Sequence, residues 1–160
     1  ILDEQMLIDF LIYPLAYLYR HHIELVLKTI IIIGNAYTAE KPPKFDHHLN
    51  ELWGHARRYI SMVGETGDPE PLDAAGELVS EFNKFDFGSF AFRYPVTKKG
   101  SNALSGVTHI NVRHFAETAS KLGFFLTCCM TGMDVVLDDK QEYLAEMLSE
   151  IVSGYAPGEP

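Results

Sequence analysis

Five side chains that could do chemistry recur at helical spacing in an otherwise apolar stretch. They are Tyr17, Arg20, His21, Glu24 and Lys28, three or four positions apart, so they share one helix face. A helix that is apolar on nearly every other side lies inside a bundle, where charges must be paired or line a wet cleft. In a cleft, Arg20 or Lys28 would hold an anion and His21 would transfer protons.

The same stripe has a second interpretation, as an ion-paired contact between helices. Glu24 precedes Lys28 by four positions, the favoured order for a helical ion pair, and Arg20 reaches Glu24 from one turn earlier. Both interpretations need this helix to be enclosed by its neighbours. They differ in whether the charged groups keep access to solvent.

Histidines near the second predicted helix raise the alternative of a metal site. His48 and His55 are seven positions apart, which places them two turns apart on one helix face. They could bind zinc or iron if neighbouring side chains joined them, namely Asp46, His47, His21 and His22. None of these spacings is an established metal motif, so we expect no metal or other cofactor and treat a metal-dependent bundle enzyme as an alternative.

The elements that must position these residues are predicted to be mostly helical. The hydrophobic periodicity predicts four main helices and a short fifth, over Asp3–Ile33, Asp46–Val63, Leu72–Phe85, Asn111–Met133 and Asp138–Val152. Gly34 and Asn35 would end the first helix, and Asp46 would cap the second. The fourth has the regular spacing of an antiparallel bundle helix. The fold class is therefore a four- to five-helix bundle, as a single domain over residues 1–160.

An extended or hairpin insertion is expected near residues 89–106. Its first part alternates aromatic residues around Arg93, and Lys98 and Lys99 follow. Such a segment could stack on RNA bases beside its cations, with Arg93 in a binding role. In the other interpretation its aromatic side chains pack on the bundle.

Composition limits the function classes. The 160 residues carry a net charge of −9, which disfavours loose binding to nucleic acid. Cys128 and Cys129 are adjacent and no other cysteine exists, so a disulfide framework is excluded and we expect a reducing, cytoplasmic compartment. Arg20, Glu24 and Lys28 interrupt the first apolar stretch, so we expect no membrane span there.

Two stretches resemble the HEPN superfamily of helical-bundle domains. The first is YPLAYLYRHHIELVLKTIIIIG, with Glu24 and Lys28 as the Glu-x-x-x-Lys element; the second is FDHHLNELWGHARRYI, a His-rich start before a leucine-rich face. The resemblance covers residues 11–60 and otherwise only the number of helices. It implies a homodimeric bundle, either a metal-independent RNase of toxin–antitoxin or antiviral defence systems or an inactive module that binds RNA, nucleotide or a partner protein.

The resemblance also implies where catalysis would lie. Active members carry Arg or Asn, four to six residues and then His, and this chain has that spacing at Asn50–His55 and at Asn102–His109. The second pair lies in the expected part of the chain, so His109 would deprotonate a ribose 2′-hydroxyl and Asn102 would stabilise the phosphate, with Glu24 and Lys28 assisting. The ligand would be held by Arg20, His21, His48, His55 and Arg93. We expect a binding module first and an endoribonuclease second.

Overall fold

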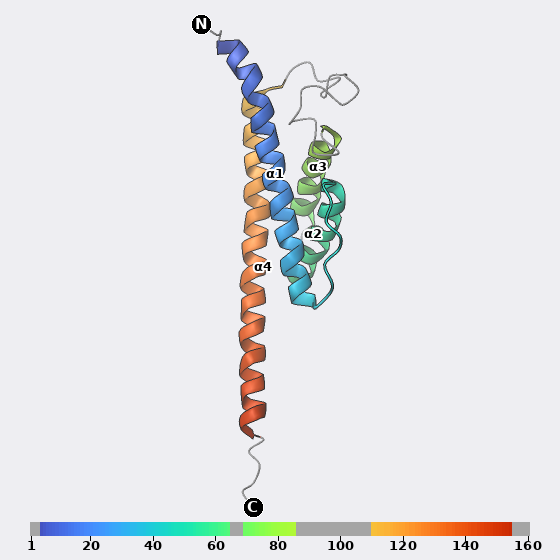
Figure 1. Cartoon of the computed structure of the whole chain (residues 1–160), viewed down its shortest axis with the longest axis vertical. Helices are drawn as coiled ribbons and strands as arrows, with labels where there is room; N and C mark the ends of the chain where they lie inside the picture. Colours follow the sequence, from blue (N-terminus) through green and yellow to red (C-terminus); the bar gives the residue numbers. More distant parts are fainter. Residues whose placement is uncertain (1–3, 65–68, 86–109, 155–160) are drawn as a thin grey trace, which may run out of the picture.

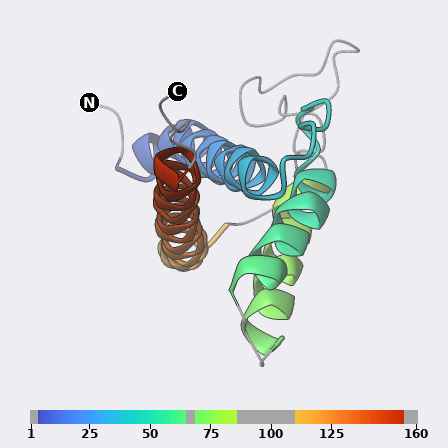
Figure 2. The ribbon, with the colours of Figure 1, turned by 90° about the horizontal axis from the view of Figure 1, so that it is seen from below.

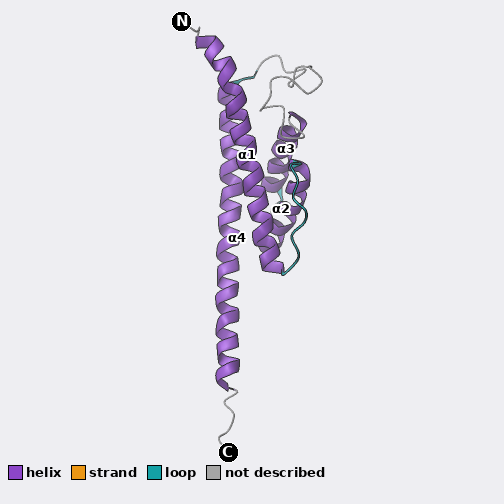
Figure 3. Cartoon of the chain, viewed as in Figure 1, coloured by secondary structure: helices purple, strands orange, loops and turns teal. Residues whose placement is uncertain are grey.

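The structure is a bundle of four α-helices. This computed structural model describes residues 4–64, 69–85 and 110–154, and within those ranges it contains no strand. The helices are α1 (Glu4–Thr38), α2 (Leu49–Val63), α3 (Glu70–Phe85) and α4 (Val112–Gly154) (Figures 1 and 3). The mostly helical fold class is therefore confirmed.

Helix α1 is the centre of the arrangement. It packs against α4 on one side and α2 on the other, and α3 covers α2 (Figure 2). The chain directions follow from two contacts at opposite ends of the α1–α4 pair: Tyr19 with Ser120, and Tyr37 with Lys140. Helices α1 and α4 thus run parallel, so the predicted antiparallel packing of the fourth helix is wrong.

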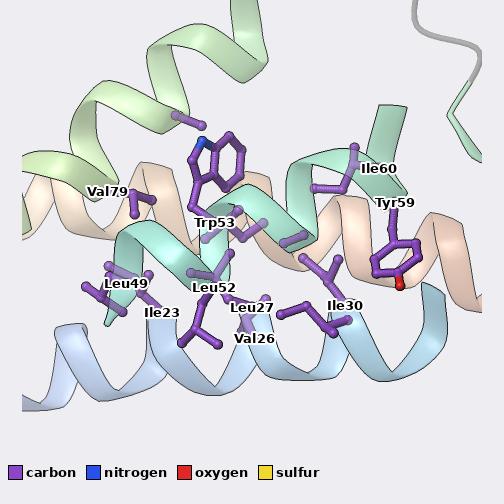
Figure 4. Packing of buried hydrophobic residues seen from close by; sticks show 14 of the residues in the cluster. Ile23, Val26, Leu27, Ile30, Leu49, Leu52, Trp53, Tyr59, Ile60 and Val79 are labelled. Carbon is purple, nitrogen blue, oxygen red and sulfur yellow. The ribbon is translucent and has the colours of Figure 1, made fainter. Parts of the chain in front are cut away.

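The core forms where α1, α2 and α4 meet. Ile23, Leu27 and Ile30 of α1 are fully buried against Leu52 of α2 and Leu126 of α4 in one cluster (Figure 4). Trp53 belongs to the same cluster and lies between α2 and α3, where its indole is next to Gly76. The spacing of three and four along each helix produces these buried faces.

Helix α1 continues one turn beyond the predicted stop at Gly34. A Cβ built on Gly34 would overlap the ring of Tyr59, so this glycine is a close-packing position within the helix. The helix ends instead at Thr38; the next residue, Ala39, has a positive φ of 57°, and the N–H of Glu40 donates to the carbonyl of Asn35. This is the geometry of a Schellman C-cap.

Two other predicted boundaries are also wrong. Asp46 does not cap α2 directly, since the N-cap residue is His48; the Asp46 carboxylate accepts a hydrogen bond from the N–H of His48 at 2.7 Å. The predicted fourth and fifth helices are one helix, α4, because no Gly or Pro separates Met133 from Asp138. The insertion predicted near residues 89–106 lies outside the described residues.

Helix α4 has 43 residues and extends past the C-terminal end of α1, which has 35 (Figure 1). Lys140 donates a hydrogen bond to the carbonyl of Tyr37 near the end of α1, and every residue from 141 to 154 is exposed (Figure 1). We call residues 141–154 the α4 extension. Among the described helices, α4 is also the one long and apolar enough to cross a membrane by length and composition, a test that core helices of soluble proteins also pass.

Candidate functional site

The polar stripe of α1 forms a closed network around Glu24. One carboxylate oxygen, Oε2, accepts a hydrogen bond from Arg20 Nη1 at 2.7 Å, and the other, Oε1, accepts from Lys28 Nζ at 2.7 Å. The side chains of Arg20 and Glu24 are 0% and 2% exposed. The spacing of four positions explains the geometry, because it stacks the three side chains along one face.

His47 joins this network from outside α1. Its Nδ1 lies 2.8 Å from Glu24 Oε1, and its backbone carbonyl accepts a hydrogen bond from Arg20 Nη2 at 2.6 Å. His47 lies at the end of the connection between α1 and α2, just before the N-cap of α2. The network therefore holds the start of α2 against the middle of α1.

The protonation state of Glu24 follows from these contacts. Burial alone would raise its pKa, but hydrogen bonds from Lys28, Arg20 and His47, with the positive charge of Lys28, lower the pKa to about 2. The carboxylate is thus ionised at neutral pH and its oxygens are occupied by donors. A general base works best with a pKa near the operating pH, so the geometry favours a positioning role for Glu24 over proton transfer.

The remaining side chains of the predicted site are dispersed. His21 stacks on Tyr17, with ring centroids 5.7 Å apart and an interplanar angle of 7°. His48 has its Nε2 3.9 Å from an Asp46 carboxylate oxygen, and His55 is exposed on α2. Arg93, Asn102 and His109 lie outside the described residues, so their predicted roles remain predictions.

From the sequence, His47 was considered only as a possible neighbour in a metal site, so its role in this network was missed. The sequence did carry one signal for a further partner, namely the balance of charge in the stripe. Arg20 and Lys28 share the Glu24 carboxylate, so a buried Arg20 guanidinium needs another hydrogen-bond acceptor. The backbone carbonyl of His47 supplies that acceptor. No feature of the sequence marks which carbonyl does so.

A second polar network at the other end of α2 was also missed. The Tyr59 hydroxyl donates to Asn35 Oδ1 at 2.7 Å and lies 2.9 Å from Glu40, whose carboxylate also pairs with Arg58. These contacts join the C-terminal end of α1 to the last turns of α2. Together, the two networks fix both ends of α2 on α1.

The metal alternative receives no support from the described residues. Within residues 4–64, 69–85 and 110–154, no three His, Cys, Asp or Glu side chains are placed to hold a metal ion. Known proteins add no information about function, because no family model, curated protein or solved structure matches this chain. The geometry of the bundle is therefore the basis for any proposal.

Proposed function

We propose that this chain is a helical-bundle module of the HEPN type that binds another protein through the exposed apolar surface of its helices. The observation that carries the proposal is the α4 extension. It is wholly exposed yet carries a set of large apolar side chains: Tyr143, Leu144, Met147, Leu148, Ile151 and Val152. Clustered exposed apolar side chains of this kind mark interaction sites.

The charges of the described residues favour a protein partner over RNA or nucleotide. Phosphate binding requires cationic side chains that are free to release counterions. Arg20 and Lys28 are paired with Glu24, while Arg57 and Arg58 are paired with Asp73 and Glu40. The cations of the candidate site thus serve internal ion pairs, and the net charge of −9 repels a polyanion.

Two predicted features belong to this proposal. A homodimer is one form that the binding could take, since α1 also exposes Leu11, Leu18, Leu25 and Ile32 at intervals of seven. A cytoplasmic location, in a prokaryotic stress or defence system, accords with adjacent unpaired cysteines. Both follow from the proposed class of module.

An RNA-cleavage assay separates the binding module from the alternative endoribonuclease. Purified chain is incubated with mixed-sequence RNA in EDTA, beside the variant His109→Ala. We expect no cleavage above background from either protein. Cleavage by the native chain that disappears in the variant would establish the RNase and contradict the proposal. Elemental analysis of the isolated protein tests the metal-dependent enzyme, which one equivalent or more of bound metal would favour.

A further inference from the structure

Helix α1 turns a narrow, uncharged seam to the solvent. Between residues 11 and 36, each exposed residue of α1 lies three or four positions from the next exposed one, and none is Asp, Glu, Lys or Arg. We call this set the α1 seam: Leu11, Pro14, Leu18, His22, Leu25, Thr29, Ile32 and Ala36. It spans about 80° of the helix circumference and about 38 Å of its length. A seam this narrow, sustained over about four heptads, is typical of a coiled-coil contact, so it selects a helix as its occupant.

The order of side chains along the α1 seam selects which helix that is. Large aliphatic side chains at every seventh position alternate with smaller or more polar ones. The first set is Leu11, Leu18, Leu25 and Ile32, which are 50% to 61% exposed, and the second is Pro14, His22, Thr29 and Ala36. The same seam laid against itself in the antiparallel direction, with Leu18 of one copy facing Thr29 of the other, sets each large side chain against a member of the second set.

The facing residues in that register are Leu11 and Ala36, Leu18 and Thr29, Leu25 and His22, and Ile32 and Pro14. Alternation of large and small side chains across a contact lets the layers interdigitate without voids. A parallel pair would instead place the large side chains together in some layers and the small ones together in the others. Thr29 suits an apolar contact because its hydroxyl already donates to the Leu25 carbonyl of its own helix at 3.0 Å.

Helix α4 adds Phe124, which is 73% exposed, to the same side of the bundle. The Tyr19 hydroxyl lies 2.9 Å from Ser120 Oγ, and His22 lies against Gly123, so these residues mark the faces that α1 and α4 turn to each other. From those faces, the middle of the α1 seam lies about 70° round α1 in one sense, and Phe124 about 70° round α4 in the other. Because the two helices run parallel, opposite senses point to the same side. Helices α2 and α3 lie on the other side of the pair (Figure 2).

We propose that the α1 seam binds a second copy of itself in antiparallel orientation. The two-fold axis is perpendicular to the helices, at the level of His22 and Leu25. Such an axis leaves both copies of α4 on one side, and the two Phe124 side chains meet near it because Gly123 lies beside His22. Although each copy has a net charge of −9, the paired seams bring no Asp, Glu, Lys or Arg into contact. This inference rests on the proposed protein-binding function and names the partner; a helix of another protein, or a membrane, is the competing occupant.

Sedimentation equilibrium of the full chain, over a range of micromolar concentrations, tests the pairing. We expect a dimer. Leu18→Asp buries a carboxylate against Thr29 of the second copy and should weaken association at least about 100-fold. The matched control is Leu148→Asp, which makes the same change in the α4 extension at a leucine of equal exposure, 62% against 61%, and should leave the dimer intact. Circular dichroism checks that both variants keep their helices.

A distance between spin labels tests the orientation. The label is attached at Leu11→Cys, in a chain whose Cys128 and Cys129 are replaced by Ala, and the distance is measured by pulsed electron paramagnetic resonance. In the antiparallel dimer, the two labelled positions lie about 38 Å apart along the helices, because each faces Ala36 of the other copy. Labels lying side by side would show a parallel pair and overturn the proposed register.

The remaining outcomes separate this inference from the proposed function. A chain that is monomeric at every concentration would overturn the pairing. A dimer that Leu148→Asp dissociates and Leu18→Asp does not would also overturn it, while supporting protein binding through the α4 extension. Binding to vesicles of neutral or anionic lipid that Leu18→Asp removes would identify a membrane as the occupant of the α1 seam. The RNA-cleavage assay tests the proposed function separately, since its result does not depend on whether the chain is a dimer.

Discussion

Replacement of Glu24 by Gln tests whether the polar stripe stabilises the fold. The variant keeps the size of the side chain but removes the charge that neutralises Arg20, whose side chain is fully buried. A buried guanidinium that loses a carboxylate partner is costly because its charge stays out of water and is then less well compensated. We therefore expect a large loss of stability with little change in shape.

Two estimates of the loss agree. Removal of one partner of a buried ion pair costs about 3–5 kcal/mol. Independently, the lowering of the Glu24 pKa from 4.5 to about 2 corresponds to about 3 kcal/mol of folding free energy at neutral pH. We expect Glu24→Gln to lower the free energy of unfolding by about 3 kcal/mol. This is a large part of the 5–15 kcal/mol typical of a domain.

The loss should also depend on pH in a defined direction. A carboxyl group whose pKa is lower in the folded state stabilises the fold above its unfolded pKa, and that contribution disappears as pH falls through the folded pKa. For Glu24, the difference between native and variant protein should be complete above about pH 5 and shrink as pH falls from 4.5 toward about 2. Urea denaturation followed by Trp53 fluorescence at several pH values measures it.

Two further proteins control this experiment. Glu77→Gln removes an exposed carboxylate from α3 and should change stability by no more than about 0.5 kcal/mol. The double variant Arg20→Met with Glu24→Leu removes both members of the buried pair and should lose less than Glu24→Gln alone. A loss below about 1 kcal/mol for Glu24→Gln, or one that is as large at pH 2 as at pH 7, would refute the assignment of the stripe to stability.

The other substitutions test packing and hydrogen bonding, each measured by chemical denaturation followed by circular dichroism. Trp53→Ala should cost about 3–5 kcal/mol, since Trp53 is 8% exposed; a much smaller loss would show that the indole is not part of the core. Gly34→Ala should destabilise through overlap with Tyr59, whereas Gly132→Ala, where a Cβ meets nothing within 4 Å, should stabilise by about 0.5–1 kcal/mol; equal effects would contradict the close packing at Gly34. Tyr59→Phe should cost about 1–3 kcal/mol by removing the donor to Asn35, and an unchanged midpoint would show that this hydrogen bond contributes nothing.

Periodic apolar spacing was sufficient to predict the mostly helical fold class. It was not sufficient for boundaries. Glycine often ends a helix, yet Gly34 lies within α1, where the ring of Tyr59 packs too closely for a Cβ atom. Asp134 and Asp138 resemble the polar start of a new helix, yet α4 continues through them, since no Gly or Pro separates Met133 from Asp138. Such outcomes depend on contacts between segments distant in sequence.

In the candidate site, too, local contacts were predictable and contacts between distant segments were not. The local pairs Arg20–Glu24 and Glu24–Lys28 were predictable, because four-residue spacing in a helix brings the side chains together. The contribution of His47 was not, because it depends on the path of the connection between α1 and α2. The sequence alone also did not decide whether the stripe lines an open cleft or forms a closed set of ion pairs. The position of the His47 carbonyl, rather than any residue type, favours the closed arrangement.

The two unusual features of this chain have opposite consequences for function. The buried charges of α1 look catalytic in the sequence, but each has an internal partner, so the network is suited to holding α2 in place. The apolar residues of the α4 extension look like an ordinary helix core, but no described part of the chain covers them. Solvent exposure of residues such as Leu144 and Ile151 is unfavourable unless another molecule covers them. The surface of α4 is therefore the place to test the proposed function, whereas the polar stripe holds α2 on α1.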